Sequence, residues 1–479
     1  MAEIHPLLTV DAVGSSQPLV VNNAFDGEPI AELDTANGDC VEKALACAHA
    51  LYKNRQEWLE LDQRVAILER TAELMTEQRD ALAVQAAQEG GKPLIDSRIE
   101  VARAIDGIKI CIEVMRAHEG KVIPMGTTAA SRQRLAFTRK EPIGVVVAVS
   151  AFNHPLNLIV HQVAAAVATG CPVIVKPADD TPLSCYAFVK LLHQAGLPMG
   201  WCQALVTDEL ATAQALVTDS RVAFFSFIGS AKVGWMLRSL LAPGTRCALE
   251  HGGAAPVILE ADADWELALP ALTKGGYYHA GQVCVSVQRV FAPAGQAAAF
   301  AAALAGLASQ LRIGDPVDDQ TDVGPLIRAR EVERVAAWVS EAIEGGAQRL
   351  TGGDPLSRTT YPCTVLLDPP KDANVSQQEI FGPVVCVYPY DNVADAYAIA
   401  NDLPFSFQAA VFTRDLDRAL AAYKNLDASA VMVNDHTAFR VDAMPFAGLR
   451  ESGLGIGGIP YTMEDMTVDK MLVVKSGVL

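Results

Sequence analysis

The stretch GVVVAVSAFNHPLNLIVHQVAAAVATGCPVIVKPADD, residues 144–180, decides the fold. It places a run of mostly β-branched residues, 145–149, before a helical segment, 155–168, which ends at Gly170. A second short apolar run, 172–175, follows directly. A buried strand, a helix and another buried strand in this order predict a parallel βαβ unit with helices packed against the sheet.

The same alternation continues along most of the chain. After residue 180 we expect strands at 202–206 and 222–227. We expect helices at 182–196, in the stretch that ends at Leu216, and from about Ser230. A second alternating set runs from Pro256 to about residue 433, with strands expected at 286–291, 384–388 and 409–412. Two α/β domains, each with a parallel sheet, are therefore predicted.

Other segments lie outside this alternation. Residues 38–118 are rich in helical patterns, and within them 63–89 has helically spaced apolar residues and ends at Gly90-Gly91, a plausible cap. Residues 132–139 alternate apolar and polar side chains with no helix after them, which is typical of a hairpin. The apolar run 471–474 is expected to be a late strand paired away from its own core, with another subunit as one partner.

Composition narrows the class of protein. Of 479 residues, 51% are hydrophobic, enough for large buried cores, and 38 Lys and Arg stand against 56 Asp and Glu, for a formal charge of −18. This acidic balance argues against binding to nucleic acid or to an anionic membrane. No apolar run approaches the about 20 residues that cross a bilayer, and the N-terminus does not resemble a signal peptide.

The ten cysteines form no pair or His cluster with the spacing of a zinc site, and the nine histidines form no HExxH motif. We therefore expect no metal, and a reducing cytoplasm as the compartment.

A thiol and a carboxylate stand out as candidates for chemistry. Cys284 ends the string Gly281-Gln282-Val283-Cys284, and Glu250 lies thirty-four residues before it. A thiolate can attack an electrophilic carbon, and a carboxylate can activate the water that releases the product. Alone, a cysteine in an apolar sequence is more often a buried core residue.

Two further strings, each after a predicted strand, suit an anionic, sugar-containing ligand. Lys176 and Asp179 follow a predicted strand, where Lys can pair with a phosphate or ribose and Asp can accept ribose hydroxyls, although solvated charges are an alternative. Gly229, Ser230 and Gly234 follow another strand and begin a helix, which suits a phosphate or a bland tight turn equally well.

Asn153, after the first strand, can donate to a developing oxyanion or cap a helix ahead of Pro155. Glu379 and Phe381 precede a turn into a strand, where they either hold a ribose and stack on a planar ring or form a turn with a core Phe.

In this order, these strings resemble the sequence boxes of the nonphosphorylating, NAD(P)-dependent aldehyde dehydrogenase superfamily. The matching stretches, spread over about 130–460, are Ala151-Phe152-Asn153-His154-Pro155, Glu250-His251-Gly252-Gly253, Gly281-Gln282-Val283-Cys284, Glu379-Ile380-Phe381-Gly382-Pro383 and the late box 445–455.

The resemblance implies that an aldehyde is oxidised to a carboxylic acid. Cys284 would attack the aldehyde, Asn153 with the Cys284 amide would hold the oxyanion, and Glu250 would assist hydrolysis of the thioester. The implied dinucleotide contacts are Lys176, Asp179, Gly229, Ser230, Gly234, Glu379 and Phe381.

The family fold implies a Rossmann-like NAD-binding domain (1–121 and 142–248), a catalytic domain (249–459) and a β oligomerisation arm (122–141 and 460–479). Its arm implies a homodimer or homotetramer.

Four positions depart from the family pattern. Asp179 replaces the ribose-binding Glu; its charge still opposes a 2′-phosphate, which favours NAD while leaving NADP possible. His251 replaces a Leu beside Glu250, either as a buried neutral residue or to tune that base. Ser406 and Ala447 stand where the family usually has Gly.

The string 434–445 resembles a branch that acts on small polar aldehydes such as lactaldehyde, glycolaldehyde or phosphonoacetaldehyde. Arg440, with His154 near the oxyanion Asn, could hold an anionic tail; alternatively, Arg440 pairs with Asp442 or another acid to stiffen the loop. Aromatic or aliphatic aldehydes also remain open as substrates. A CoA-acylating relative usually lacks a carboxylate at Glu250, and a non-catalytic structural member would be expected to lose Cys284 or Asn153.

Overall fold

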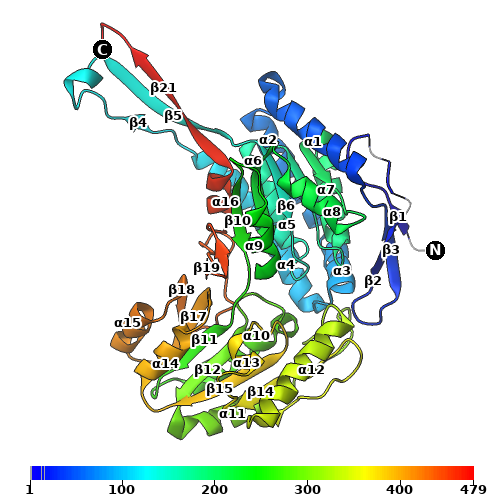
Figure 1. Cartoon of the computed structure of the whole chain (residues 1–479), viewed down its shortest axis with the longest axis vertical. Helices are drawn as coiled ribbons and strands as arrows, with labels where there is room; N and C mark the ends of the chain where they lie inside the picture. The colour runs from blue at the N-terminus through cyan, green and yellow to red at the C-terminus, as the bar shows by residue number, and fades with distance from the viewer. Residues whose placement is uncertain (1–2, 12, 16) are drawn as a thin grey trace.

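The computed structural model describes residues 3–11, 13–15 and 17–479. Figure 1 shows two bodies of helices and strands, one above the other, with a long β-arm that projects from the upper body. The predicted mixed α/β fold with parallel sheets is confirmed. Among the described residues, no helix is both long and apolar enough to cross a membrane.

The upper body is built on a six-stranded sheet with the order β20-β10-β9-β6-β7-β8. All its neighbours run parallel except β20, which is antiparallel to β10. The strands are β6 (Val145–Val149), β7 (Val173–Lys176), β8 (Cys202–Ala204), β9 (Val222–Ile228), β10 (Arg246–Glu250) and β20 (Gly453–Leu454). Since the chain leaves β6 toward β7 on one side and later returns to β9 on the other, a crevice is expected at the carboxyl ends of β6 and β9.

The helical segment after β6 contains a π-helical turn that the sequence did not predict. It runs through α5 (Asn157–Ile159), the π-helical turn η3 (Val160–Ala164) and α6 (Ala165–Thr169), and Gly170 closes it with a φ of 81°. A π-helical turn rotates the side chains that follow relative to an ideal α-helix. Here the turn contains His161 and Gln162, both buried, and Gln162 Nε2 donates to the carbonyl oxygens of β6 and β9.

Helices cover both faces of this sheet. They are α1 (Gly38–Lys53), α2 (Leu61–Glu77), α3 (Arg79–Gly90), α4 (Leu94–Ala117), α7 (Pro182–Gln194), α8 (Leu210–Thr218) and α9 (Ala231–Ser239), with short 3₁₀ turns η1 (Arg55–Glu57) and η4 (Met199–Trp201). The periodic stretch 63–89 is two helices, because Gln78 leaves helical geometry, with ψ at 12°. Gly91, with φ at 75°, provides the left-handed cap expected at that end. A small sheet, β1 (Glu3–His5), β3 (Pro29–Leu33) and β2 (Leu19–Asn22), precedes these helices.

The lower body is built on a seven-stranded sheet with the order β13-β14-β15-β12-β11-β17-β18, parallel except for β13. Its strands are β11 (Ala255–Leu259), β12 (Val287–Pro293), β13 (Gln348–Thr351), β14 (Thr364–Leu367), β15 (Val384–Tyr390), β17 (Gln408–Phe412) and β18 (Ala430–Val433). Its helices are α10 (Trp265–Tyr277), α11 (Ala294–Ala308), α12 (Ala329–Glu344), α13 (Asn374–Gln377), α14 (Val393–Asn401) and α15 (Leu416–Asn425). Each body has its own apolar core around its sheet.

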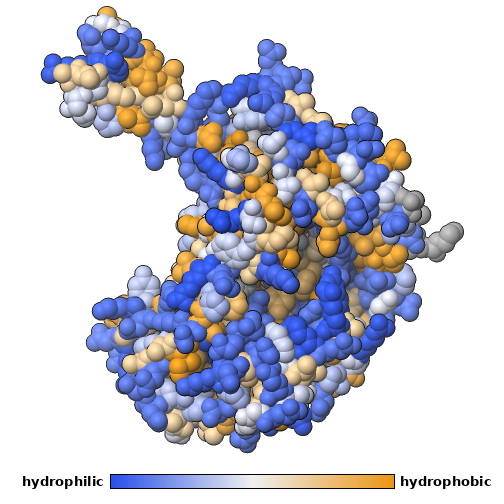
Figure 2. All heavy atoms as spheres, viewed as in Figure 1, coloured by the Kyte–Doolittle hydropathy of each residue, from blue (hydrophilic) through white to orange (hydrophobic). Residues whose placement is uncertain are grey.

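The arm is a three-stranded antiparallel sheet made of β4 (Val122–Ile123), β5 (Arg134–Pro142) and β21 (Thr467–Lys475). The late strand pairs with β5 of the same chain, from Thr467 opposite Pro142 to Lys475 opposite Arg134. A pairing with another subunit stays a prediction. Residues 132–139 form most of β5, and the chain through the 3₁₀ turn η2 (Ala129–Ser131) connects it to its antiparallel partner β4, so the predicted hairpin is present. Figure 2 shows apolar residues gathered on the visible face of this arm.

Two late segments of the chain return to the upper body. The domain boundaries themselves stay a prediction. Strand β20 lies at the edge of its sheet, and α16 (Ile459–Asp465) places Ile459 and Met463 in its apolar core. The late chain also forms β19 (Leu449–Arg450), which pairs with β16 (Phe405–Ser406). Ser406 has no left-handed backbone, and its hydroxyl donates to the carbonyl of Asp427.

We expect the Glu141→Gln variant to lose stability that the wild type has at neutral pH. Glu141 is 6% exposed at its side chain and contacts Arg55, Arg139 and Lys470, which ties the arm to the upper body. Burial raises its pKa, but these three cations outweigh burial and lower it from 4.5 to about 2. Because the folded pKa is depressed, the stabilisation is present above pH 4.5 and is lost as the pH falls through about 2.

Thermal unfolding of both proteins between pH 7 and pH 2 would measure this effect. The difference between wild type and variant should be largest at neutral pH and shrink over that acidic range; a constant difference would contradict the prediction.

Candidate active site

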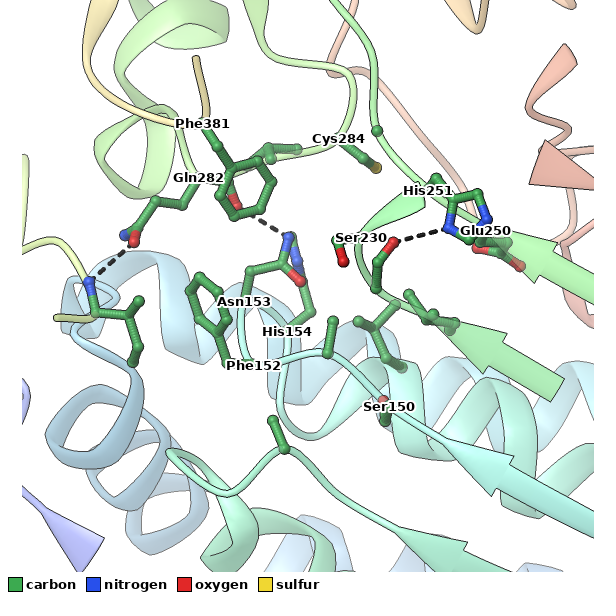
Figure 3. A pocket seen from close by; sticks show the side chains of 18 of the residues that line it. Ser150, Phe152, Asn153, His154, Ser230, Glu250, His251, Gln282, Cys284 and Phe381 are labelled. Atoms are coloured by element: carbon green, nitrogen blue, oxygen red, sulfur yellow. Dashed lines mark hydrogen bonds between the residues drawn. The ribbon is translucent and has the colours of Figure 1, made fainter. Parts of the chain in front are cut away.

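A cavity of about 610 Å³ lies between the two bodies, and Figure 3 shows its centre. The upper body contributes residues that follow β6, β7, β9 and β10, and the lower body contributes the loops that precede β12 and β15. All the predicted site residues except Gly234 line it, namely Cys284, Glu250, Asn153, Lys176, Asp179, Gly229, Ser230, Glu379, Phe381, His154 and Arg440. Residues far apart in the sequence are thus brought to one space.

Cys284 is presented by a turn in an unusual backbone conformation. The 3₁₀ turn η5 (Tyr278–Gly281) ends in three consecutive residues, 279–281, with φ of 48°, 54° and 70°. A Cβ on Gly281 would lie 2.1 Å from the carbonyl oxygen of Gly382, so this position accepts only glycine. Such left-handed runs are held in place by their surroundings and often mark functional sites.

Gln282 holds this turn from several sides. Its side chain accepts a hydrogen bond from the Ile327 amide at 2.9 Å and donates to the carbonyl oxygens of His279 and Pro325. Its own carbonyl oxygen accepts from Asn153 Nδ2 at 2.9 Å, as the dashed line in Figure 3 shows. The Asn153 amide, only 5% exposed, therefore lies beside the loop that presents Cys284.

The thiol and the carboxylate of this cavity are both protonated more readily than in water. Burial, with the nearby Glu379 carboxyl, raises the pKa of Cys284 to about 12. Burial also raises the pKa of Glu250, although Arg440 opposes the shift. Glu250 ends β10, and its Oε1 lies against Gly457, where a Cβ would be only 2.2 Å away. Cys284 is therefore a neutral thiol at neutral pH, and it must lose its proton to act as a nucleophile.

Glu379 and Phe381 form another part of the wall. Burial raises the pKa of Glu379 to about 8, and its Oε1 is buried without a hydrogen-bond partner among the described residues. The carboxyl packs against Gly252, where a Cβ would lie 1.5 Å from Oε1. Phe381 has a φ of 46°, and its ring meets that of Phe152 edge to face, with centroids 5.8 Å apart. A carboxyl with one free acceptor oxygen beside two aromatic rings fits a ribose hydroxyl and a planar ring.

The other predicted cofactor residues lie at the carboxyl ends of β7 and β9. Lys176 Nζ contacts Asp179 Oδ1 at 2.6 Å, and the Asp179 side chain is 50% exposed toward the cavity mouth. Gly229 and Ser230 lead into the N-terminus of α9, where backbone amides favour an anion. These groups fit the phosphates and sugars of a dinucleotide.

Gly234 lies behind His251 and outside the cavity lining. A Cβ at Gly234 would be 2.1 Å from His251 Cε1, so the glycine makes room for the ring. His251 Nδ1 lies 2.8 Å from the carbonyl oxygen of Gly229 and donates to it, and burial lowers the pKa of the imidazole. His251 is thus a buried neutral residue that ties the end of β10 to the turn after β9.

The far end of the cavity is lined by cationic and polar side chains. Arg440 lies over the Phe446 ring, with its guanidinium carbon 3.7 Å from the centroid. His154 Nε2 is 3.4 Å from the hydroxyl of Tyr278, and burial holds the pKa of His154 well below its usual value. Arg103, from α4, lines the same end.

Sequence reasoning assigned no role to several residues of this site, namely Arg103, Asn157, Gln282, Tyr278, Gly252 and Gly457, and it named Asp442 only as a partner of Arg440. Gln282 and Gly252 lie inside the boxes already quoted, so their motifs carried the signal. Arg103 lies in a helix more than 300 residues from its partner Asp442, and no local pattern marks such a contact.

Comparison with known proteins agrees with this geometry. An aldehyde dehydrogenase family model matches residues 12–472. The chain is 36% identical over 459 residues to a 3-sulfolactaldehyde dehydrogenase from Priestia aryabhattai, covering 96% of this chain and 95% of the relative.

Two solved structures are similar over nearly their whole length. Aldehyde dehydrogenase 21 from Physcomitrella patens, in complex with its reaction product succinate, has a TM-score of 0.95 at 31% identity and covers 100% of both chains. A glyceraldehyde-3-phosphate dehydrogenase from Methanocaldococcus jannaschii, complexed with NADP, has a TM-score of 0.91 at 32% identity and covers 96% of this chain and 100% of its own.

We expect Gly281→Ala to destabilise the protein by more than about 1 kcal/mol, because a Cβ at this positive φ meets a carbonyl oxygen. Urea unfolding would measure the loss, and alkylation of Cys284 with iodoacetamide would report the displaced turn. Gly295→Ala is the matched control, since Gly295 lies in α11 and no atom lies within 4 Å of an added Cβ. If both variants unfold alike, the backbone constraint assigned to Gly281 is wrong.

Proposed function

The chain belongs to the aldehyde dehydrogenase family, and we propose that it oxidises a small aldehyde with an anionic tail to the carboxylic acid, with NAD as the cofactor. Cys284, Glu250 and Asn153 carry the reaction, and Arg440 with His154 selects the substrate. The prediction of an NAD(P)-dependent aldehyde dehydrogenase is confirmed at the level of the family. The identity of the tail and the roles of these residues are the proposal.

The observation that carries the proposal is that no carboxylate in the part of the chain that the structure describes directly contacts the Arg440 guanidinium, although the charges of Glu250 and Asp442 act on it from farther away. Its Nε is buried without a hydrogen-bond partner, and no carboxylate among the described residues lies within 4 Å of its guanidinium. The alternative partner, Asp442, instead binds Arg103, Asn157 and His161. A cation in a buried space is costly unless an anion meets it, so an anionic ligand in this cavity would be favoured.

Two neutral groups complete this end of the cavity. Burial raises the pKa of Tyr278 and lowers that of His154, so the phenol and the imidazole stay uncharged at neutral pH. Both can donate or accept a hydrogen bond. They suit a hydroxyl or an oxygen of a sulfonate, phosphonate or carboxylate better than a long alkyl chain.

The names of the relatives support the same class of substrate. Sulfolactaldehyde and glyceraldehyde 3-phosphate, named for two of them, carry a sulfonate and a phosphate, and succinate, the product bound to the third, has a second carboxylate. In each case a short aldehyde or its product has an anionic group a few bonds from the reacting carbon.

The reaction begins with the Cys284 sulfur, which bonds to the aldehyde carbon as its thiol proton passes to solvent water, so that Glu250 remains ionised for the later step. The carbonyl oxygen gains the negative charge, and Asn153 Nδ2 with the Cys284 backbone amide donates to it. Bound NAD supplies the acceptor for the hydride that leaves this carbon. Glu250 then deprotonates a water that opens the Cys284 thioester, which releases the acid and restores the thiol.

Asp179 supports NAD over NADP. Its carboxylate, held 2.6 Å from Lys176, lies where ribose hydroxyls are expected and would oppose a 2′-phosphate. The orphan Oε1 of Glu379 offers an acceptor to the other ribose.

A homodimer or homotetramer is proposed to form through the arm. The β4, β5 and β21 strands expose apolar side chains that a second copy would cover, namely Val122, Leu135, Phe137, Met471, Leu472, Val473 and Val474. All ten cysteines are free, which suits the reducing cytoplasm proposed as its location.

The experiment compares 3-sulfolactaldehyde with lactaldehyde, which lacks the sulfonate, by following NADH formation. The wild type should prefer the sulfonate, and Arg440→Gln should lower the ratio of the two kcat/KM values by about tenfold to a hundredfold, because a charge-assisted contact is lost. Arg98→Gln is the control, since Arg98 pairs with Asp319 at the surface. A wild type that prefers lactaldehyde, or a neutral aromatic or aliphatic aldehyde, would overturn the anionic substrate class.

A further inference from the structure

Asp442 lies at the centre of a buried cluster on the wall behind Arg440. It is 4% exposed, and its carboxylate accepts from Arg103 Nε at 3.1 Å and Nη2 at 2.7 Å. Asn157 Nδ2 and His161 Nε2 reach its Oδ1 at 3.1 and 2.7 Å. These three partners belong to α4, α5 and η3 of the upper body, whereas Asp442 lies in the loop after β18 of the lower body.

The hydrogen-bond geometry fixes the state of His161. Its Nδ1 lies 3.5 Å from Arg440 Nη2, and a guanidinium has only donors, so Nδ1 is the acceptor. The ring proton is therefore on Nε2, which donates to Asp442. A neutral imidazole thus joins the Asp442 carboxylate to the Arg440 guanidinium.

Arg440 is held on two sides without being neutralised. His161 contacts one nitrogen, and the Phe446 ring supports the flat face. Its Nε keeps no partner in the described structure. Asp442 lies two residues along the same loop, and the Arg103 cation lies within 4 Å of its carboxylate. Among the described residues, no carboxylate lies within that distance of the Arg440 guanidinium.

We propose that Asp442 is a positioning residue for substrate selection: through His161 and the shared loop, it holds Arg440 where the anionic tail of the aldehyde binds. This inference rests on the proposed function, because it gives a role to Asp442 only if Arg440 binds the tail. The π-helical turn contributes by directing His161 toward the loop.

A purely electrostatic role for Asp442 predicts the opposite sign. Removing its negative charge would uncover the cation of Arg103, which lines the same end of the cavity, and would strengthen the binding of an anion. Removing a positioning residue would weaken that binding, because an amide accepts at one oxygen only and the loop loses its ties to Arg103. The direction of the change therefore separates the two roles.

The test measures kcat and KM of Asp442→Asn with 3-sulfolactaldehyde and with lactaldehyde. We expect the KM for 3-sulfolactaldehyde to rise about tenfold, and the KM for lactaldehyde to rise much less. An equal loss for both aldehydes, as a general folding defect would give, or a lower KM for the sulfonate would overturn the proposal. Asp319→Asn is the matched control, since Asp319 pairs with Arg98 of α4 at the surface.

A double-mutant cycle tests whether Asp442 acts through Arg440. In the Arg440→Gln background, Asp442→Asn should change the preference for the sulfonate by less than about twofold, because the group that it positions is gone. Additive effects would overturn the proposal. If Arg440→Gln alone leaves the preference unchanged, the proposed anionic substrate fails; if only Asp442→Asn leaves it unchanged, the present inference fails and the substrate class stands.

His161→Leu provides a second variant in case Asp442→Asn does not fold. It removes the acceptor for Arg440 but leaves the Arg103–Asp442 ion pair in place. We expect the same selective rise in the KM for 3-sulfolactaldehyde, and an unchanged ratio between the two aldehydes would overturn the role assigned to His161.

Discussion

The hydrogen bond from Asn153 Nδ2 to the carbonyl oxygen of Gln282 joins the two halves of the site. Asn153 follows β6 of the upper sheet, and Gln282 belongs to the loop that leads into β12 of the lower sheet. Gln282 in turn holds the left-handed turn before Cys284 through its own amide. Because both partners are buried, the contact is protected from water. It fixes the position of the Asn153 amide relative to the Cys284 thiol.

Burial explains the pKa values of the acidic groups in the cavity. The cavity takes Cys284, Glu250 and Glu379 out of water and raises the pKa of each, so the thiol stays protonated and the two carboxyls hold a proton to a higher pH than in water. The same burial makes charge expensive, which is why Arg103 is balanced by Asp442. No carboxylate among the described residues contacts Arg440 directly, and an anionic substrate would balance the charge of its guanidinium.

Much of this arrangement could be predicted from the sequence because it depends on local patterns. The β6 and β7 strands and the Gly170 cap follow from a short apolar periodicity and one glycine. The quoted boxes named Cys284, Glu250 and other residues at the centre of the cavity, because each box combines a strand end with a turn.

Contacts between distant segments could not be predicted in this way. The β21 strand was expected to pair away from its core, but nothing in its own sequence selects β5 as its partner. The π-helical turn that contains His161 is hidden by an ordinary helical period, and the contact of His161 with Asp442 joins distant segments. The role of Arg103 likewise depends on its partner Asp442, which lies in the lower body.

The most direct measurement is the intact mass of Glu250→Gln after rapid mixing with NAD and 3-sulfolactaldehyde, followed by peptide mapping. The glutamine cannot activate water, so the account predicts an acyl adduct on the peptide that contains Cys284, with only slow turnover after one equivalent of NADH. The same adduct should be absent in Cys284→Ala. Full steady-state turnover without an adduct, or an adduct on another residue, would contradict the assignment of nucleophile and base.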